Sequence, residues 1–240
     1  MKKWKMAALS LCLGAAAGVW AALSAADTSP APPPALTTRT GTGEAAESGD
    51  WALTLVNGSH PLPDDFSPDV TAVDRYPDRK FDVRAVEHLN ALLADAEKAG
   101  HPLYLVSTYR SVSYQKGLFT RKTNFYKNKG YAQQAAEEQA AQWVARPGCS
   151  EHNLALAADI VSKNWYSSHS DLTGEFAETA EFQWLYANCA QYGFILRYPE
   201  GKSGVTGVEY EPWHYRYVGE AAAKEIMAQN TTLEEYLEHL

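Results

Sequence analysis

Three residues of this chain, His152, Asp159 and His214, have side chains that can bind a metal ion and lie beside apolar segments. Residues 154–158 form an apolar run that ends at Asp159, and burying an unpaired carboxylate is costly. Zn²⁺ accepts imidazole nitrogen and carboxylate oxygen together, and a catalytic zinc commonly has three protein ligands and a water. A single His–Asp pair arises often by chance. With His214 as the third ligand, the sequence predicts one zinc site.

Glu211 stands three residues before His214, in the sequence Glu-Pro-Trp-His. Positions three apart in a regular strand face opposite sides, but Pro212 cannot donate to a strand ladder and favours a bend or an edge. Such a bend turns Glu211 towards the side that His214 faces. Zinc lowers the pKa of a bound water towards about 7. We therefore expect Glu211 to take the proton of that water and pass it to a leaving amine.

Arg110 follows a β-prone run, 103–108, and precedes a helix-like segment, 113–127. Side chains at such junctions commonly face a cleft. A guanidinium group binds a carboxylate through two parallel hydrogen bonds, which suits an enzyme that recognises a free C-terminus. A structural ion pair is the alternative role for any single arginine.

The elements that must position these residues mix helices and strands without a βαβ rhythm. This pattern predicts an α+β fold, one domain with a mainly antiparallel sheet flanked by helices. We expect strands at 103–108, 154–162, 194–198 and 213–218. We expect helices at 81–99, 113–127, 132–145, 175–192, 219–229 and 233–240, the last capped by Thr231 or Thr232. Three glycines predict a flexible turn or loop over 201–207.

The first 50 residues differ in composition from the rest. Residues 1–26 begin with lysines and continue as an uncharged apolar stretch, which favours a cleaved signal peptide. The alternative is an uncleaved membrane anchor, because the stretch has about the roughly 20 residues that a spanning helix needs. Residues 27–50 are rich in Pro, Ala and Thr and predict a linker. Both alternatives predict an exported domain over 51–240.

Composition limits the other function classes. The chain is 45% hydrophobic and 21% charged, as in ordinary globular proteins. Its formal net charge is −8, and we expect no basic patch with interleaved aromatic residues and no nucleic-acid partner. In an oxidising compartment, Cys149 and Cys189 either form one disulfide or remain buried thiols. Zinc ligation by Cys149 is disfavoured while His and Asp ligands are available.

Four stretches of this chain resemble the VanY-like zinc D-alanyl-D-alanine carboxypeptidases. They are 107–111 with Gln115, 150–159, 193–199 and 211–219, and they span nearly all of residues 51–219 in order. The resemblance implies a Hedgehog/D,D-peptidase-like fold, zinc bound by the two histidines and the aspartate, and the glutamate before Pro-Trp-His as the base. It also implies that Arg110, Gln115 and Ser150 hold the terminal carboxylate of the substrate. We add Tyr109, Trp213 and Tyr198 to the substrate-binding set, although the last two also suit the core.

The activity implied is removal of the C-terminal D-alanine from peptidoglycan stem peptides by an exported monomer that faces the cell wall. We favour D,D-cleavage of pentapeptides over L,D-cleavage of tetrapeptides. A non-catalytic wall-binding module is disfavoured because a pure binder has no need of Glu211. An endopeptidase is disfavoured by the intact set of Arg110, Gln115 and Ser150.

One residue departs from the family pattern. Ala155 stands between His152 and Asp159 where the family usually has glycine. Glycine is common where the backbone needs a positive φ angle. If this position has a positive φ, alanine costs of the order of 1 kcal/mol there. We expect a small effect on activity and none on the fold.

Overall fold

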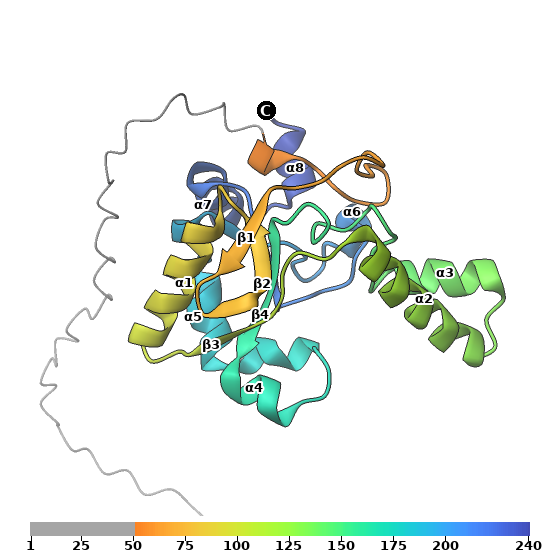
Figure 1. Cartoon of the computed structure of the whole chain (residues 1–240), viewed down its shortest axis with the longest axis horizontal. Coiled ribbons are helices and arrows are strands. Elements are labelled where there is room, and N and C mark those ends of the chain that lie inside the picture. Colours follow the sequence, from red (N-terminus) through yellow and green to blue (C-terminus); the bar gives the residue numbers. More distant parts are fainter. Residues whose placement is uncertain (1–50) are drawn as a thin grey trace, which may run out of the picture. The chain divides into compact units, whose positions relative to one another are not determined.

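A four-stranded antiparallel sheet lies at the centre of residues 51–240, the part of the chain that this computed structural model describes (Figure 1). The strand order is β3-β4-β6-β5. The strands are β3 (Leu103–Ser107), β4 (Ala157–Ser162), β6 (His214–Tyr217) and β5 (Phe194–Leu196). The predicted strands are therefore all present, and their ends differ by a few residues. The predicted signal or anchor (1–26) and linker (27–50) lie outside the described residues.

The register of this sheet brings three polar side chains together. Every residue of β4 and of β6 is buried, including His214 and Arg216 on β6. Asp159 pairs with His214 on β6 and with Ser107 on β3. An irregularity between Leu105 and Ser107 shifts the register next to this point. The two central strands thus place the carboxylate directly beside an imidazole.

A separate two-stranded sheet was not expected from the sequence. It consists of β1 (Val70–Val73) and β2 (Tyr76–Asp82), which pair antiparallel. Only three of the eleven residues of β1 and β2 are buried and several are charged, so no alternation of apolar residues marks these strands. The helix expected at 81–99 was wrong at its start, because Phe81 belongs to β2. That helix, α1, spans Val86–Lys98.

The helices α2 (Val112–Asn128) and α3 (Gln133–Ala141) pack against each other and extend away from the sheet, at the right of Figure 1. We call this pair the arm. The side chain of Ser111 caps α2 by accepting a hydrogen bond from the backbone N–H of Tyr114 at 3.2 Å. The second helix was expected to reach residue 145, but α3 ends at Ala141, and residues 142–145 lead back to the body.

The long helix expected at 175–192 is three pieces. A 3₁₀ helix (Gly174–Glu178) is followed by α5 (Ala180–Asn188) and a second 3₁₀ helix (Cys189–Tyr192). Thr179 breaks the first junction with an extended backbone, and its hydroxyl accepts from the N–H of Phe182 at 3.1 Å. Gly193 ends the series at a φ of 80°, and a Cβ there would lie 2.7 Å from the ring of Tyr217.

The remaining elements are short. A 3₁₀ turn (Trp51–Leu53) opens the described part, α4 (Lys163–Ser168) follows β4, and α6 (Ser203–Thr206) is one helical turn within the predicted loop. The chain ends in α7 (Glu220–Gln229) and α8 (Leu233–Leu237), and Thr232 caps α8 in a capping box. Within residues 51–240, no helix combines the length and apolar character needed to cross a membrane.

The main core fills the space between the central sheet and the helices α1 and α5. Its fully buried apolar members include Phe81, Leu89, Leu92, Leu105, Ile160, Leu185 and Phe194. Cys189 is buried in this core and Cys149 is half-buried, and both are free thiols. Of the two alternatives for these cysteines, the structure has the unpaired one.

Candidate active site

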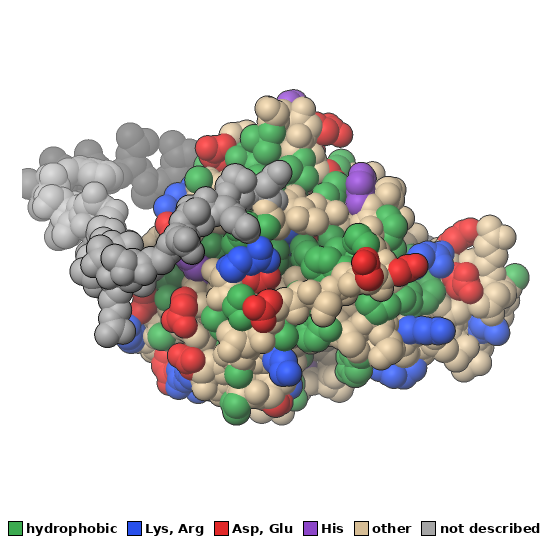
Figure 2. Space-filling model, turned by 45° about the horizontal axis from the view of Figure 1, so that its top comes forward, with side chains coloured by type: hydrophobic (Ala, Val, Ile, Leu, Met, Phe, Trp, Pro, Cys, Tyr) green, Lys and Arg blue, Asp and Glu red, His purple; other side chains and the backbone are tan. Residues whose placement is uncertain are grey.

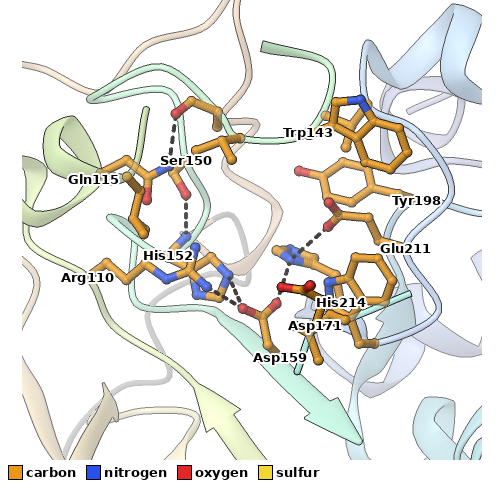
Figure 3. Close-up of a pocket in the computed structure, with 16 residues that line it drawn as sticks. Arg110, Gln115, Trp143, Ser150, His152, Asp159, Asp171, Tyr198, Glu211 and His214 are labelled. Carbon is orange, nitrogen blue, oxygen red and sulfur yellow. Dashed lines mark hydrogen bonds and ion pairs between the residues drawn. The ribbon is translucent and has the colours of Figure 1, made fainter. Parts of the chain in front are cut away.

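A cavity of about 370 Å³ opens at the end of the central sheet where the arm joins the body (Figure 3). All of the predicted site residues except Tyr109 line it. The lining residues are Arg110, Gln115, Leu118, Trp143, Val144, Ala145, Ser150, His152, Asp159, Asp171, Leu172, Tyr198, Val208, Glu211, Trp213 and His214. Residues from five separate segments of the sequence therefore meet at one place.

The predicted metal ligands lie together on the floor of this cavity. Nε2 of His152 is 3.2 Å from Oδ2 of Asp159, and Nδ1 of His214 is 3.1 Å from Oδ1 of the same carboxylate. One potential ligand atom from each of the three residues lies within 4.8 Å of the others, and all three side chains are buried. Two imidazole nitrogens and one carboxylate oxygen are a donor set that suits a catalytic zinc ion.

The hydrogen bonds of the two imidazoles favour this ligand geometry. Nδ1 of His152 is 2.7 Å from the backbone oxygen of Thr108, and Nε2 of His214 is 3.4 Å from Oε2 of Glu151. An oxygen that accepts from one ring nitrogen fixes the proton there and leaves the other nitrogen free to bind a metal. The free nitrogens, Nε2 of His152 and Nδ1 of His214, are the two that face Asp159.

Glu151 is a residue of the site that the sequence analysis did not single out. Its carboxylate is fully buried and accepts from Nε of Arg197 at 2.6 Å and from Nη1 of Arg216 at 2.8 Å. The two guanidinium groups are also fully buried. The sequence offered only a partial signal: Arg197 directly follows the apolar strand β5 and Arg216 lies in β6, and a buried arginine requires an anionic partner, but nothing local identifies Glu151 as that partner.

This buried charge cluster reaches both ends of the described chain. Arg197 also donates to the two carboxylate oxygens of Glu234 on α8, at 2.7 and 2.8 Å. Nη2 of Arg216 donates to the backbone oxygens of Ala52 and Thr54, at 2.9 and 2.8 Å. Glu151, which contacts the imidazole of His214, is therefore held by two arginines that bind the first and last segments of the domain.

Glu211 lies above the metal-ligand cluster, as the expected bend at Pro212 requires. The backbone N–H of Glu211 donates to the oxygen of Tyr198 at 3.2 Å, and that of His214 donates to the oxygen of Glu211 at 3.1 Å. This turn brings Oε2 of Glu211 to 3.7 Å from Nδ1 of His214. Burial raises the pKa of Glu211 to about 8, so its carboxyl group exchanges a proton near neutral pH.

Burial and charge separate the pKa values of the three potential metal ligands. Burial, together with the charge of Arg110, lowers the pKa of His152 to about 4. Burial acts in the same direction on His214, but hydrogen bonds to Asp159 and Glu151 outweigh it and raise the pKa to about 9. Burial would raise the pKa of Asp159, yet the charges of His152 and Arg110 hold it well below its usual value.

The predicted carboxylate-holding residues gather on one side of the cavity (Figure 3). The guanidinium of Arg110 donates from Nε to Oγ of Ser107 at 2.8 Å and pairs through Nη2 with Asp159. Gln115, on α2, donates from Nε2 to the oxygen of Ala145 at 2.8 Å. Oγ of Ser150 accepts from the N–H of His152 at 3.3 Å, so its own hydroxyl proton remains available. Charged and neutral donors thus face the same space.

The aromatic members of the predicted set divide. Tyr198 and Trp213 line the cavity although they are 8% and 7% exposed, so each serves the core and the cavity wall. The ring of Tyr198 lies 4.8 Å from that of His214. Tyr109 does not line this cavity. Its backbone N–H donates to the oxygen of Lys80 at 3.0 Å, and it lines a neighbouring hollow beside β2. Trp143, at the end of the arm, lines the cavity and was not expected.

Ala155 adopts the conformation that its place in the sequence indicated. Its φ angle is 65°, in the left-handed region, and its side chain is buried. The backbone around it is hydrogen-bonded on both sides, from its N–H to the oxygen of His152 at 3.3 Å and from the N–H of Asp82 to its oxygen at 3.1 Å. The strained residue therefore lies in the turn that positions His152.

Comparison with known proteins agrees with this geometry. The VanY family profile, described as D-alanyl-D-alanine carboxypeptidase, matches residues 78–220. A D-alanyl-D-alanine carboxypeptidase of Enterococcus faecalis is 36% identical over 233 residues, which cover 91% of this chain and 83% of that protein.

Two solved structures are similar over most of their length. One is a mutant of the vancomycin resistance D,D-pentapeptidase VanY in complex with Zn(II), with a TM-score of 0.68 and 39% identity over 78% of this chain and 99% of that one. The other is the LD-carboxypeptidase LdcB, with a TM-score of 0.65 and 37% identity over 80% of this chain and 88% of that one. The chain thus belongs to the VanY family of D-alanyl-D-alanine carboxypeptidases.

Proposed function

We propose that this protein is a zinc-dependent carboxypeptidase that removes the C-terminal D-alanine from peptidoglycan stem peptides, with D,D-cleavage favoured. The observation that carries the proposal is the arrangement of the cavity. The cluster of His152, Asp159 and His214 lies between Glu211 on one side and the donors around Arg110 on the other (Figure 3). The scissile peptide bond would lie over the metal-ligand cluster, beside the base Glu211, and the terminal carboxylate would lie at the donors around Arg110.

The proposed roles follow from the contacts. His152, Asp159 and His214 hold one zinc ion, which when bound supplies a Lewis acid and lowers the pKa of a water molecule. Glu211 is the general base, since its buried carboxyl group has a pKa near the operating range. It takes a proton from the attacking water and donates it to the leaving amino group of D-alanine.

Arg110, Gln115 and Ser150 bind the carboxylate of the terminal D-alanine. The guanidinium offers paired N–H groups, and the amide and hydroxyl supply neutral donors. Arg110 pairs with Asp159 in this structure, so it exchanges one carboxylate partner for another when a substrate enters. Tyr198 and Trp213 pack beside the reacting residue and limit its size. Tyr109 acts from outside the cavity, by supporting the backbone of Arg110.

The choice between D,D- and L,D-cleavage rests on the pocket for the residue before the scissile bond. VanY is described as a D,D-pentapeptidase and LdcB as an LD-carboxypeptidase, and their similarity to this chain is nearly equal. The full-length relative named D-alanyl-D-alanine carboxypeptidase supports the D,D reading. We also propose that the domain is exported and acts as a monomer at the wall, since that is where such a substrate lies.

The test is hydrolysis of two synthetic substrates, a stem pentapeptide ending in D-Ala-D-Ala and the matching tetrapeptide. Released D-alanine is measured by mass, with zinc at full occupancy and again with a chelator. We expect release from the pentapeptide, loss of activity with the chelator, and little activity of Glu211→Gln at unchanged zinc content. Release from the tetrapeptide alone would establish the L,D alternative, and release from neither would refute the enzyme.

A further inference from the structure

The arm carries a basic surface that the composition of the whole chain conceals. Residues 112–131 contain no Asp or Glu although the formal net charge of the chain is −8. Their basic residues are Lys116, Arg121, Lys122, Lys127 and Lys129. The expectation that this protein has no basic patch with interleaved aromatic residues was therefore wrong. Figure 2 shows several Lys and Arg side chains at the end of the molecule that the arm forms, with acidic side chains beside them; α3 carries Glu137 and Glu138.

These cations lack carboxylate partners. In residues 51–240, no ion pair within 4.0 Å involves a basic residue of 112–131. Exposed lysines elsewhere do pair, as Lys98 does with Asp95 at 2.7 Å and Lys224 with Glu220 at 3.2 Å. An unneutralised group of like charges favours an anionic partner.

Four side chains on the arm and at its helix ends form a row in which rings and ammonium groups alternate. Nζ of Lys122 lies 5.4 Å from the ring centroid of Trp143 and 5.6 Å from that of Phe125. Nζ of Lys129 lies 4.3 Å from the ring centroid of Phe125. The rings of Trp143 and Phe125 are 42% and 48% exposed. We call these four residues the arm track.

The arm track begins at the catalytic cavity, since Trp143 lines both. In Figure 3, Trp143 lies across the cavity from Arg110 and Gln115, with the metal-ligand residues between them. A peptide held by its terminal carboxylate at Arg110 therefore directs its remaining length towards Trp143. The exposed ring surface at that rim meets the part of the substrate that precedes the scissile bond.

We propose that the arm track binds the carboxylate-bearing sugar–peptide polymer that continues beyond the cleaved residue, so that assembled cell wall is a better substrate than a short stem peptide. The inference rests on the proposed function and specifies its substrate class. The flat faces of sugar rings carry C–H groups that pack on exposed aromatic rings, and peptide carboxylates pair with ammonium groups.

An anionic lipid surface is the other ligand class for such a patch, and the structure favours it less. Interfacial helices present a continuous apolar face to the acyl boundary. The buried face of α2, formed by Gln115, Phe119 and Thr123, is already covered within the protein. The exposed ring of Phe125 is instead flanked by Lys122 and Lys129, which suits a ligand with alternating sugar faces and charges.

The test compares Phe125→Ala/Lys129→Ala with the control Lys163→Ala/Tyr166→Ala on α4, which also removes one exposed ring and one lysine, although these two contact Tyr104 and Glu97. Both variants and the wild type are assayed for D-alanine release from a short pentapeptide and from isolated polymeric wall. We expect the arm variant to need about fivefold to tenfold more wall for half-saturation at low salt. That change corresponds to the binding contribution of one exposed charge and one stacked ring. The difference shrinks at high salt because exposed charges are screened.

For the short peptide, kcat/KM of the arm variant stays within about twofold of wild type, and the control matches wild type on both substrates. Equal effects on wall and peptide, or no effect on either, would overturn the inference. Binding of anionic vesicles that is lost in the arm variant, with unchanged wall hydrolysis, would overturn it in favour of a lipid surface. If the wild type releases no D-alanine from the short peptide, the proposed function is refuted rather than the role of the arm track. Binding of the Glu211→Gln protein to isolated wall, measured by sedimentation, still tests the arm track in that case.

Discussion

Replacing Glu151 by Gln tests whether the buried charge cluster positions a metal ligand or only stabilises the fold. The change keeps the shape of the side chain but removes the charge that faces Arg197, Arg216 and Nε2 of His214. Breaking a buried ion pair by removing one partner costs about 3–5 kcal/mol. Loss of a carboxylate behind a metal-binding histidine lowers metal affinity by about 10- to 100-fold.

Glu234→Gln is the matched control, because it removes the same charge from the other side of Arg197. Glu234 is 11% exposed and does not contact His214, so we expect a loss of about 1–3 kcal/mol in stability. Its zinc affinity stays within about twofold of wild type, because Glu151 still holds the imidazole. The two variants therefore share a loss of stability and differ in zinc affinity.

The assay combines two measurements on each variant. Chemical denaturation of the metal-free protein gives the free energy of unfolding, and competition with a fluorescent chelator gives the zinc affinity of the folded state. If Glu151→Gln binds zinc as tightly as wild type, the positioning role is refuted. An equal loss of affinity in Glu234→Gln would show that general loosening of the domain, rather than the contact to His214, is responsible.

Three further predictions concern the site. Arg110→Lys keeps the charge but loses the guanidinium fork, so KM for the pentapeptide should rise about 10- to 100-fold while zinc affinity stays unchanged; an unchanged KM contradicts carboxylate binding. His214 has a pKa raised to about 9, so it is protonated at neutral pH and zinc must displace its proton. The zinc affinity should therefore rise about tenfold per pH unit from about 6 to 9. Calorimetry over this pH range measures the affinity, and buffers of different ionisation heat report the released proton. A pH-independent affinity would contradict that pKa. Ala155→Gly should stabilise the protein by up to about 1 kcal/mol in denaturation, since relief of about 1–2 kcal/mol at a positive φ exceeds about 0.8 kcal/mol for the buried methyl; a clear loss of stability would contradict it.

The positions of the site residues were predictable because each lies in a short motif with a local physical signature. Asp159 ends an apolar run, and the register of β4 and β6 then places it opposite His214. Pro212 indicated the bend that returns Glu211 to the cavity. The positive φ of Ala155 was also accessible, since glycine is the usual residue there in the family that the chain resembles.

What escaped the sequence depends on contacts between distant segments. The strands β1 and β2 have few buried residues and show no apolar alternation, so Phe81 was assigned to the following helix. The contact of Glu151 with Arg197 and Arg216 joins residues 46 and 65 positions apart, and no local pattern reports it. The arm track was hidden because an acidic net charge over the whole chain says nothing about one helix.

Tyr109 was predicted to bind substrate together with Arg110, and it does not line the cavity. A shared motif suggested that Tyr109 and Arg110 act together, but consecutive residues after a strand point in different directions. Arg110 pairs with Asp159 and lines both the cavity and the hollow beside β2, whereas Tyr109 lines the hollow and not the cavity. Proximity in sequence therefore did not predict that the two residues differ in lining the cavity.

The most direct test of the central claim is the mass of the product formed from a stem pentapeptide by the zinc-loaded protein. We predict release of a single D-alanine, loss of that activity with a chelator, recovery on adding zinc, and no comparable release by Glu211→Gln that retains zinc. Full activity of Glu211→Gln, or an intact pentapeptide after incubation with the zinc-loaded wild type, would refute the proposed mechanism.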